Sequence, residues 1–358
     1  MRRDRTTRRI SGLLSGLTLL FAVAACASVE SGLASREGSS AAPEPSTAAA
    51  SPSTGSPSPS ASTSPSGTAH STTRPRPTEP SSAPPKTSAA VEAGYPNAGN
   101  TGPRGFLKRD ASGNVSIRTD GAVIKGKDIV GSLDIYADDV TIIDTKITST
   151  NWWGVNLRPG FKGLRVLHST ITAIPGEGPD NGGVNYAVSN MGSSSIEVGW
   201  CDISVFGNAL SMGQGYLHDN YVHGLIPFRN SGGEWQHTDA VISGGGNSGK
   251  LIVRHNTLLN SVPVDKGASA AIGLFADTGH VSNTVIDDNL LAGGAYALYG
   301  GGDGATGITV TDNVFSTRYH RYSGHYGAVT AWNAGGAGNV WSGNRFSDGT
   351  PITPRKAG

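Results

Sequence analysis

The chain has 358 residues and carries 28 basic and 27 acidic side chains, a formal net charge of +1 with neutral histidines. Proteins that bind nucleic acid usually gather a strong basic excess, so this balance excludes nucleic acid as the expected partner. The 51 glycines argue against a mainly helical fold, because glycine is costly inside helices.

Residues 1–25 predict an export signal. The segment "MRRDRTTRRISGLLSGLTLLFAVAA" joins a basic stretch to a short apolar run and ends in small residues. The apolar run is too short for a membrane-spanning helix. With the next residue, "VAAC" resembles a bacterial lipobox, which implies a diacylated Cys26 and a lipoprotein anchored to the outer face of the bacterial cell membrane. The alternative is plain secretion with an incidental cysteine.

Residues 26–94 predict a disordered linker. They consist almost entirely of Ser, Pro, Thr, Ala and Gly, and they contain no aromatic residue. Such a composition cannot bury enough apolar surface to offset the entropy of the chain. We therefore expect this linker to hold a folded domain, residues 95–358, away from a cell surface. Without residues 1–25 the chain has 23 basic and 26 acidic side chains, a net charge of −3.

A short phrase recurs through the folded domain, for example "VTIIDTKIT" from Val140 and "ITVTDNVFS" from Ile308. Its marker position is held by Thr145, Ser169, Cys201, Asn220, Asn256, Asn289, Asn313 and Asn344. The markers lie 19 to 36 residues apart. A constant phrase at variable spacing indicates a solenoid with loops inserted in some turns. Val and Ile at alternate positions indicate β-strands.

A second phrase lies between the markers, for example "AVIS" from Ala240 and "ALYG" from Ala297. At least two short strands per turn with Gly-rich corners predict an all-β parallel β-helix of about 8–10 coils, with equivalent residues stacked about 4.8 Å apart. The stacked Asn side chains should form a hydrogen-bonded ladder at a corner. Cys201 occupies one ladder position, so we expect a buried small residue rather than a nucleophile.

The segment "VIKGKDIVGSLDIYADDVTI", Val123 to Ile142, resembles a phrase that precedes the first coils in a group of secreted bacterial β-helix proteins. The repeats as a whole resemble the right-handed parallel β-helix proteins of the pectate-lyase-like superfamily. This resemblance implies that fold for residues 95–358. It implies no single activity, because the superfamily contains lyases, hydrolases, epimerases and non-catalytic surface proteins.

Four long insertions follow the same point of the repeat, just after the aliphatic residue that closes the marker phrase. They are Ala173–Val184, Gly224–His237, Asn260–Ala270 and Ser316–Gly327. Loops that leave a solenoid at one corner stand side by side, so we expect a wall with a groove beside it, suited to a chain-like ligand. The alternative is that loops collect where they do least harm.

Three consecutive coils carry charged pairs after their strands: His218–Asp219, Arg254–His255 and Asp287–Asp288. If the coils are in register, these six groups lie within about 10 Å of one another. We therefore take His218, Arg254 and Asp287 as candidate catalytic residues. The alternative is a solvated ladder of ion pairs.

The longest insertion ends in "GGEWQHTDAVIS", which brings Glu234, Trp235, His237 and Asp239 onto the coil that carries Arg254. The phrase resembles "HxDG[IV]Q" of the related β-helix proteins, although Ala240 replaces the Gly and Ile242 replaces the Gln. Two residues apart on a strand, His237 and Asp239 should face the same side, so the carboxylate can orient the imidazole as a second catalytic candidate. The alternative is a pair that only pins the loop. Two ligands do not make a metal site.

Further candidates for substrate contact lie in loops or at coil corners. They are Trp152, Trp235, Tyr296, Tyr299, Arg229 and Lys266. Exposed rings can stack on sugars, and the alternative is that these aromatics cover the open sides of the coils.

Two functions follow from these residues. The first is an extracellular enzyme that cleaves a polysaccharide. Elimination needs a base, for which His237 and His218 are candidates, and a cation, for which Arg254 and Lys266 are candidates. Hydrolysis needs two carboxyl groups, for which Asp239, Asp287 and Asp288 are candidates. The second function is a non-catalytic, surface-anchored module that binds a glycan or envelope material. We expect a monomer with no cofactor and no metal.

Overall fold

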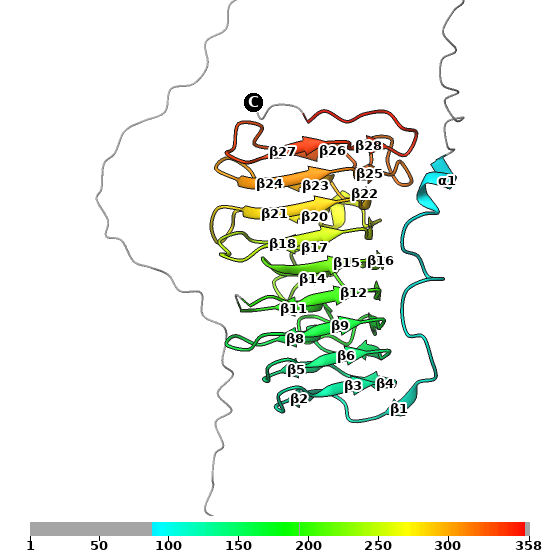
Figure 1. The fold of residues 1–358 in the computed structure, drawn as a ribbon. Coiled ribbons are helices and arrows are strands. Elements are labelled where there is room, and N and C mark those ends of the chain that lie inside the picture. Colours follow the sequence, from blue (N-terminus) through cyan, green and yellow to red (C-terminus); the bar gives the residue numbers. More distant parts are fainter. Residues whose placement is uncertain (1–87, 193, 355–358) are drawn as a thin grey trace, which may run out of the picture. The chain divides into compact units, whose positions relative to one another are not determined.

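The computed structural model describes residues 88–192 and 194–354, and they form a right-handed parallel β-helix, as predicted. Each coil contributes a strand to each of three parallel sheets, and the coils stack one above another (Figure 1). The export signal, Cys26 and most of the linker lie outside the described residues. The two helical segments are α1 (Ser88–Glu92) and the 3-10 turn η1 (Val264–Lys266). No helix among the described residues is long and apolar enough to cross a membrane.

Sheet A has ten strands and carries the ends of the marker phrases. It contains β1 (Lys108–Asp110), β4 (Lys127–Val130), β7 (Lys146–Ser149), β10 (Thr170–Ala173), β13 (Asp202–Ser204), β16 (Tyr221–His223), β19 (Thr257–Asn260), β22 (Leu290–Gly293), β25 (Val314–Phe315) and β28 (Arg345–Phe346).

Sheet B has nine strands and carries the second phrase. It contains β2 (Val115–Ile117), β5 (Leu133–Ile135), β8 (Trp153–Leu157), β11 (Tyr186–Asn190), β14 (Asn208–Ser211), β17 (Thr238–Ser243), β20 (Ala268–Leu274), β23 (Tyr296–Gly300) and β26 (Gly327–Thr330). Its inward column is aliphatic and fully buried: Val155, Val188, Leu210, Val241, Ile272 and Leu298.

Sheet C has nine strands and carries the start of each marker phrase. It contains β3 (Val123–Lys125), β6 (Thr141–Ile143), β9 (Arg165–Leu167), β12 (Glu197–Gly199), β15 (Gly215–His218), β18 (Leu251–Arg254), β21 (Ser282–Asp287), β24 (Thr306–Thr311) and β27 (Val340–Ser342).

The corner between sheets C and A has the same backbone in every coil. One residue per coil adopts a positive φ between 43° and 68°: Gly126, Asp144, His168, Trp200, Asp219, His255, Asp288, Asp312 and Gly343. Asp is among the side chains that tolerate this left-handed conformation best, which explains its frequency here. The turn separates each sheet C strand from the following sheet A strand.

The predicted Asn ladder lies at this corner. The backbone N–H groups of Asn220, Asn256, Asn289 and Asn313 each donate to the Oδ1 atom of the Asn in the next coil, at 2.9–3.0 Å. The Nδ2 groups donate to corner carbonyl oxygens, such as Leu217 O from Asn256. The ladder therefore satisfies backbone groups that the strands leave unpaired. Cys201 is a fully buried free thiol, which agrees with the prediction.

Residues 88–107 form a segment, here called the strap, that runs past the coils from α1 to β1 (Figure 1). The Tyr95 hydroxyl donates to Asp288 Oδ1 at 3.1 Å, and its ring stacks on His255. The Gly102 N–H donates to Trp200 O at 2.9 Å. Glu92 in α1 pairs with Arg318 at 2.8 Å. Ordered contacts therefore begin before residue 95, where the sequence predicted the start of the folded domain.

Candidate functional site

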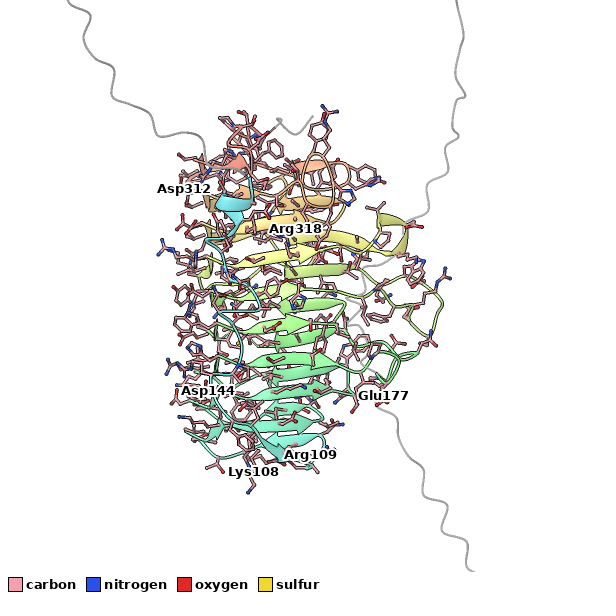
Figure 2. The ribbon with its side chains drawn as sticks, turned by 90° about the vertical axis from the view of Figure 1, so that its right-hand side faces the viewer. Lys108, Arg109, Asp144, Glu177, Asp312 and Arg318 are labelled. Carbon is pink, nitrogen blue, oxygen red and sulfur yellow. The ribbon has the colours of Figure 1, made fainter. Side chains whose placement is uncertain are left out.

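All four long insertions connect a sheet A strand to the following sheet B strand, namely β10 to β11, β16 to β17, β19 to β20 and β25 to β26. They therefore leave the solenoid at one corner, as the repeat phase predicted. In Figure 2 the loop that carries Glu177 projects from one side of the stack, and Asp144 lies towards the opposite side. Because sheet B begins where these loops end, its outer face lies beside them.

The outer face of sheet B holds two columns of side chains in register. One runs Trp153, Tyr186, Asn208, Asp239, and the other runs Asp134, Asn156, Ser189, Ser211, Ile242. Aromatic and amide side chains stand where most exposed columns of this solenoid carry charged groups. Two pockets lie on this face and are lined by residues of these columns and their neighbours, and a third lies at the last strand of the sheet, β26.

The first pocket has a volume of about 240 Å³ and lies over β8, β11 and β14. Its lining includes Trp152, Trp153, Tyr186, Ser189 and Met191. The ring of Trp152 meets those of Tyr186 and Phe228 edge to face, at centroid distances of 6.2 and 5.8 Å. These rings hold one another in place, so the aromatic wall of the first pocket is preorganised.

The middle pocket has a volume of about 470 Å³ and lies between sheet B and the end of the loop Gly224–His237. Its lining includes Tyr186, Asn208, Glu234, Trp235 and His237. Tyr186 also lines the first pocket, so the two pockets are neighbours that share one ring. Burial raises the pKa of the Tyr186 hydroxyl, so this group stays protonated and can donate a hydrogen bond.

Asn208 points an unpaired acceptor into this region. Its Nδ2 donates to Asn185 Oδ1 at 2.7 Å and to His237 O at 3.2 Å. A backbone carbonyl only accepts, so the contact with His237 O fixes which end of the amide is the nitrogen. Asn208 Oδ1 is buried and has no hydrogen-bond partner, and Asn156 Oδ1 in the neighbouring column has none either.

Asp239 lies beside Asn208 in register and is fully buried. Neither carboxyl oxygen makes a hydrogen bond of normal geometry, and one oxygen lies close to Gly273 and the Phe275 side chain. Burial raises the pKa of Asp239 well above its ordinary value, and the nearby Ser269 hydroxyl and Ala270 N–H only partly oppose this effect. Burial therefore favours the neutral, protonated form of Asp239, which has one O–H group to donate.

The end pocket lies over the last coils and has a volume of about 600 Å³. Its lining includes Tyr296, Tyr322, Tyr326, Thr330 and Phe346. Tyr299 stands between this pocket and Asp239: its ring lies 5.6 Å from that of Tyr296 and 5.1 Å from that of Phe275. The candidates Tyr296 and Tyr299 are thus on the outer face of sheet B with Trp152 and Trp235.

The candidates Arg229 and Lys266 lie in two loops of the wall but line neither the first nor the middle pocket. The Arg229 guanidinium lies 4.6 Å from the Trp235 ring, and it donates to Gly233 O at 3.1 Å. Lys266 ends η1 and is exposed. The next residue, Gly267, packs against the backbone of Gln236.

His237 and Asp239 do not form the expected pair. β17 begins at Thr238, and its register against β20 shifts between Thr238 and Asp239. His237 is therefore exposed at the end of the loop, whereas Asp239 is buried in the strand. A shared face was expected from the alternation of side chains along a regular strand. The register shift interrupts this alternation between His237 and Asp239.

His218, Arg254 and Asp287 are in register on adjacent sheet C strands, as predicted. Arg254 pairs with Asp287 at 2.8 Å, and Asp287 also accepts from the Thr311 hydroxyl at 2.6 Å. The sequence placed these groups together with His237 and Asp239. The structure instead divides them between sheet C and sheet B.

The His218 ring is buried between two carboxylates, at 2.8 Å from Asp219 and 3.3 Å from Glu197. Asp219 also contacts His255 Nδ1 at 2.6 Å, and His255 stacks on Tyr95 of the strap. This network joins the coils and holds the strap, so the ladder interpretation accounts for these groups.

Three contributors to the sheet B face were not singled out from the sequence: Tyr186, Asn208 and Asn156. Tyr186 and Asn208 open the second-phrase strands β11 and β14, in the column that also holds Trp153 and Asp239, and Asn156 lies within β8, in the column beside it. The copies of the second phrase can be aligned on their shared inward aliphatic residue. Such an alignment places all three residues in the two outward columns, and this is the signal that could have found them.

The described residues contain no group of three or more His, Cys, Asp or Glu side chains placed to hold a metal ion. Comparison of the chain with protein-family models, with curated proteins and with solved structures finds no match.

Proposed function

We propose that this protein binds an extended polysaccharide along the outer face of sheet B. The observation that carries the proposal is the pair of neighbouring pockets on this face, which share the Tyr186 ring and are lined by further aromatic side chains. Flat rings stack on sugar faces, and polar groups between them fix the orientation of each sugar. Strands of the solenoid repeat at about 4.8 Å, so a row of such sites follows a linear chain better than a compact ligand.

Cleavage of the bound chain is the second candidate, and the polar groups of the middle pocket favour it. Hydrolysis needs a carboxyl group that stays protonated and a second carboxylate. Burial favours the protonated form of Asp239, and Glu234 is available for the second role. Asp239 is nevertheless fully buried, so a proton transfer to substrate requires displacement of its cover. Binding is for this reason the function that the geometry supports best.

The cellular setting belongs to the same proposal. An export signal, a lipidated Cys26 and a linker over residues 26–94 would present the β-helix at the outer face of the bacterial membrane. There the pockets would meet extracellular or envelope glycans. The resemblance to pectate-lyase-like proteins agrees with a polysaccharide partner, whether the protein acts as a hydrolase, a lyase or a binding module.

The test is affinity electrophoresis of the full chain in gels that contain soluble polysaccharides of different charge. The binding affinity derived from the retardation should fall about tenfold in Tyr186→Ala, because this ring lines two pockets. Tyr216→Ala is the matched control, since Tyr216 is an exposed ring on sheet C. Reducing ends and the ultraviolet absorbance of unsaturated products then report hydrolysis and elimination separately. Equal loss in both variants, or no retardation by any polymer, would contradict the proposal.

A further inference from the structure

The unpaired groups on sheet B also indicate which class of glycan the pockets accept. We infer that the bound chain is an uncharged polysaccharide, one of whose free hydroxyl groups donates a hydrogen bond to Asn208 Oδ1. This inference rests on the proposed binding function and goes beyond it by choosing between neutral and acidic polymers.

The first step concerns buried polar atoms that have no hydrogen-bond partner. Asn208 Oδ1, in the lining of the middle pocket, is a buried acceptor with no hydrogen-bond partner. The Asn208 amide cannot rotate to offer its nitrogen instead, because His237 O and Asn185 Oδ1 both take hydrogen bonds from Nδ2. Buried acceptors without a partner are costly and are normally satisfied by a ligand or an ordered water. A ligand that satisfies them must carry donors.

Hydroxyl groups and protonated amines are donors, whereas a carboxylate or a sulfate is only an acceptor. Placing an anionic group against Asn208 Oδ1 would leave that acceptor unsatisfied and bring two acceptors together. Glu234 also lines the middle pocket and adds a like charge. The middle pocket therefore disfavours a uronate or a sulfated sugar.

The second step concerns cations, which an acidic glycan needs. The nearest guanidinium to the first pocket is that of Arg158, and it is already engaged. It lies 3.5 Å from Asp134, donates to the Tyr136 hydroxyl at 3.0 Å and rests on the Trp153 ring. Arg229 covers the Trp235 ring from within its own loop. Neither side chain lines the pockets themselves.

Of the two cations considered for elimination, Arg254 pairs with Asp287 on sheet C, and Lys266 is exposed at the end of η1 and lines neither pocket. No lysine or arginine lines the first or the middle pocket. The floor offers instead the hydroxyls of Ser189 and Ser211 and the rings of Trp153 and Tyr186. This combination of rings, hydroxyls and amide oxygens fits an uncharged, hydroxyl-rich chain.

Isothermal titration of the full chain with three oligosaccharide probes tests the inference: xylo-oligosaccharide (neutral), oligogalacturonate (acidic) and chitosan oligosaccharide (cationic). We expect the neutral probe to bind at least about tenfold more tightly than the acidic one. The anionic group cannot donate to Asn208 Oδ1, and the loss of one buried hydrogen bond weakens binding by about this factor. Asn208→Leu should weaken neutral binding about tenfold, because it removes the acceptor. Glu234→Lys should improve acidic binding.

The outcomes separate the two proposals. Tighter binding of oligogalacturonate that is lost in Tyr186→Ala and in Arg229→Ala would overturn the substrate class and leave glycan binding on sheet B intact. Tightest binding of the chitosan probe that is lost in Glu234→Gln would also overturn the uncharged substrate class, because it would show a preference for a cationic polymer. Absence of binding by all three probes would contradict the binding function itself.

Discussion

Replacement of Asn256 by Ala is the sharpest test of the ladder that sets the register of the coils. Asn256 is fully buried. Its Oδ1 accepts from the backbone N–H and the Nδ2 of Asn220, at 3.0 and 2.9 Å. Its Nδ2 donates to Leu217 O, Arg254 O and Asn289 Oδ1, each at 2.9 Å. Alanine removes all five contacts and leaves buried donors and carbonyl oxygens unpaired.

Each hydrogen bond contributes about 1 kcal/mol net, and some of these five share one proton, so we expect a loss of about 3–5 kcal/mol. Asn344→Ala is the matched control at the last coil. Asn344 makes three side-chain contacts, two accepted from Asn313 and one donated to Val310 O, so its loss should be about 1–3 kcal/mol.

Urea unfolding followed by circular dichroism, with native-state hydrogen exchange to detect local opening, measures both variants. Exchange is needed because a solenoid can open coil by coil. In Asn256→Ala the amides of β15, β18 and β21 should lose most protection. The reasoning is refuted if Asn256→Ala is no less stable than Asn344→Ala, or if the loss of protection is spread evenly over the coils.

Three further predictions concern other parts of the molecule. Burial raises the pKa of Asp239 above its ordinary value of 3.8, so the folded protein holds a proton that the unfolded chain releases above about pH 4. The contribution of Asp239 to stability is therefore full below pH 4 and falls as the pH rises towards the raised pKa. Thermal melts at pH 4, 5.5 and 7 should show that Asp239→Asn loses less stability over this range than the native chain. Parallel stability curves of the two proteins would contradict this. Burial also raises the pKa of the Cys201 thiol to about 12, so iodoacetamide at pH 8 should label the protein only after denaturation, and labelling of the native state would show that the thiol is accessible. Tyr95→Ala removes a ring that packs on Leu290 and Val314 and stacks on His255, so residues 88–107 should become sensitive to protease while the coils stay resistant; unchanged cleavage would mean that the strap is held elsewhere.

The fold could be predicted because its signals are repeated. The Asn markers, the alternating aliphatic residues and the constant phase of the insertions each recur over several coils, and one physical arrangement satisfies all of them. The register that brings His218, Arg254 and Asp287 onto adjacent strands followed directly from this repetition.

The candidate site could be predicted only in part. Trp152, Trp235, Tyr296 and Tyr299 were found because aromatics in loops and at corners stand out in a sequence. The separation of Asp239 from Arg254 was missed because the corner at which the loops emerge lies between sheets A and B, whereas the charged pairs end sheet C. The burial of Asp239 was missed because it depends on Phe275 and Ser269 of the next coil and on a local register shift, which no repeat reports.

The strap was not foreseen either. Residues 88–107 lack a repeat, and their position depends on single contacts of Glu92, Tyr95 and Gly102 with distant coils. The contacts of Tyr95 and Gly102 use Asp288, His255 and Trp200, three members of the corner column. Part of the charged cluster that suggests catalysis in the sequence thus has a structural role in the folded chain.

Hydrogen exchange of the full chain with and without a saturating neutral oligosaccharide tests the central claim most directly. The account predicts added protection in β11, β14 and β17 and in the loop Gly224–His237, where the first and middle pockets lie. Protection confined to β15, β18 and β21 on sheet C would contradict it and would return the site to His218, Arg254 and Asp287.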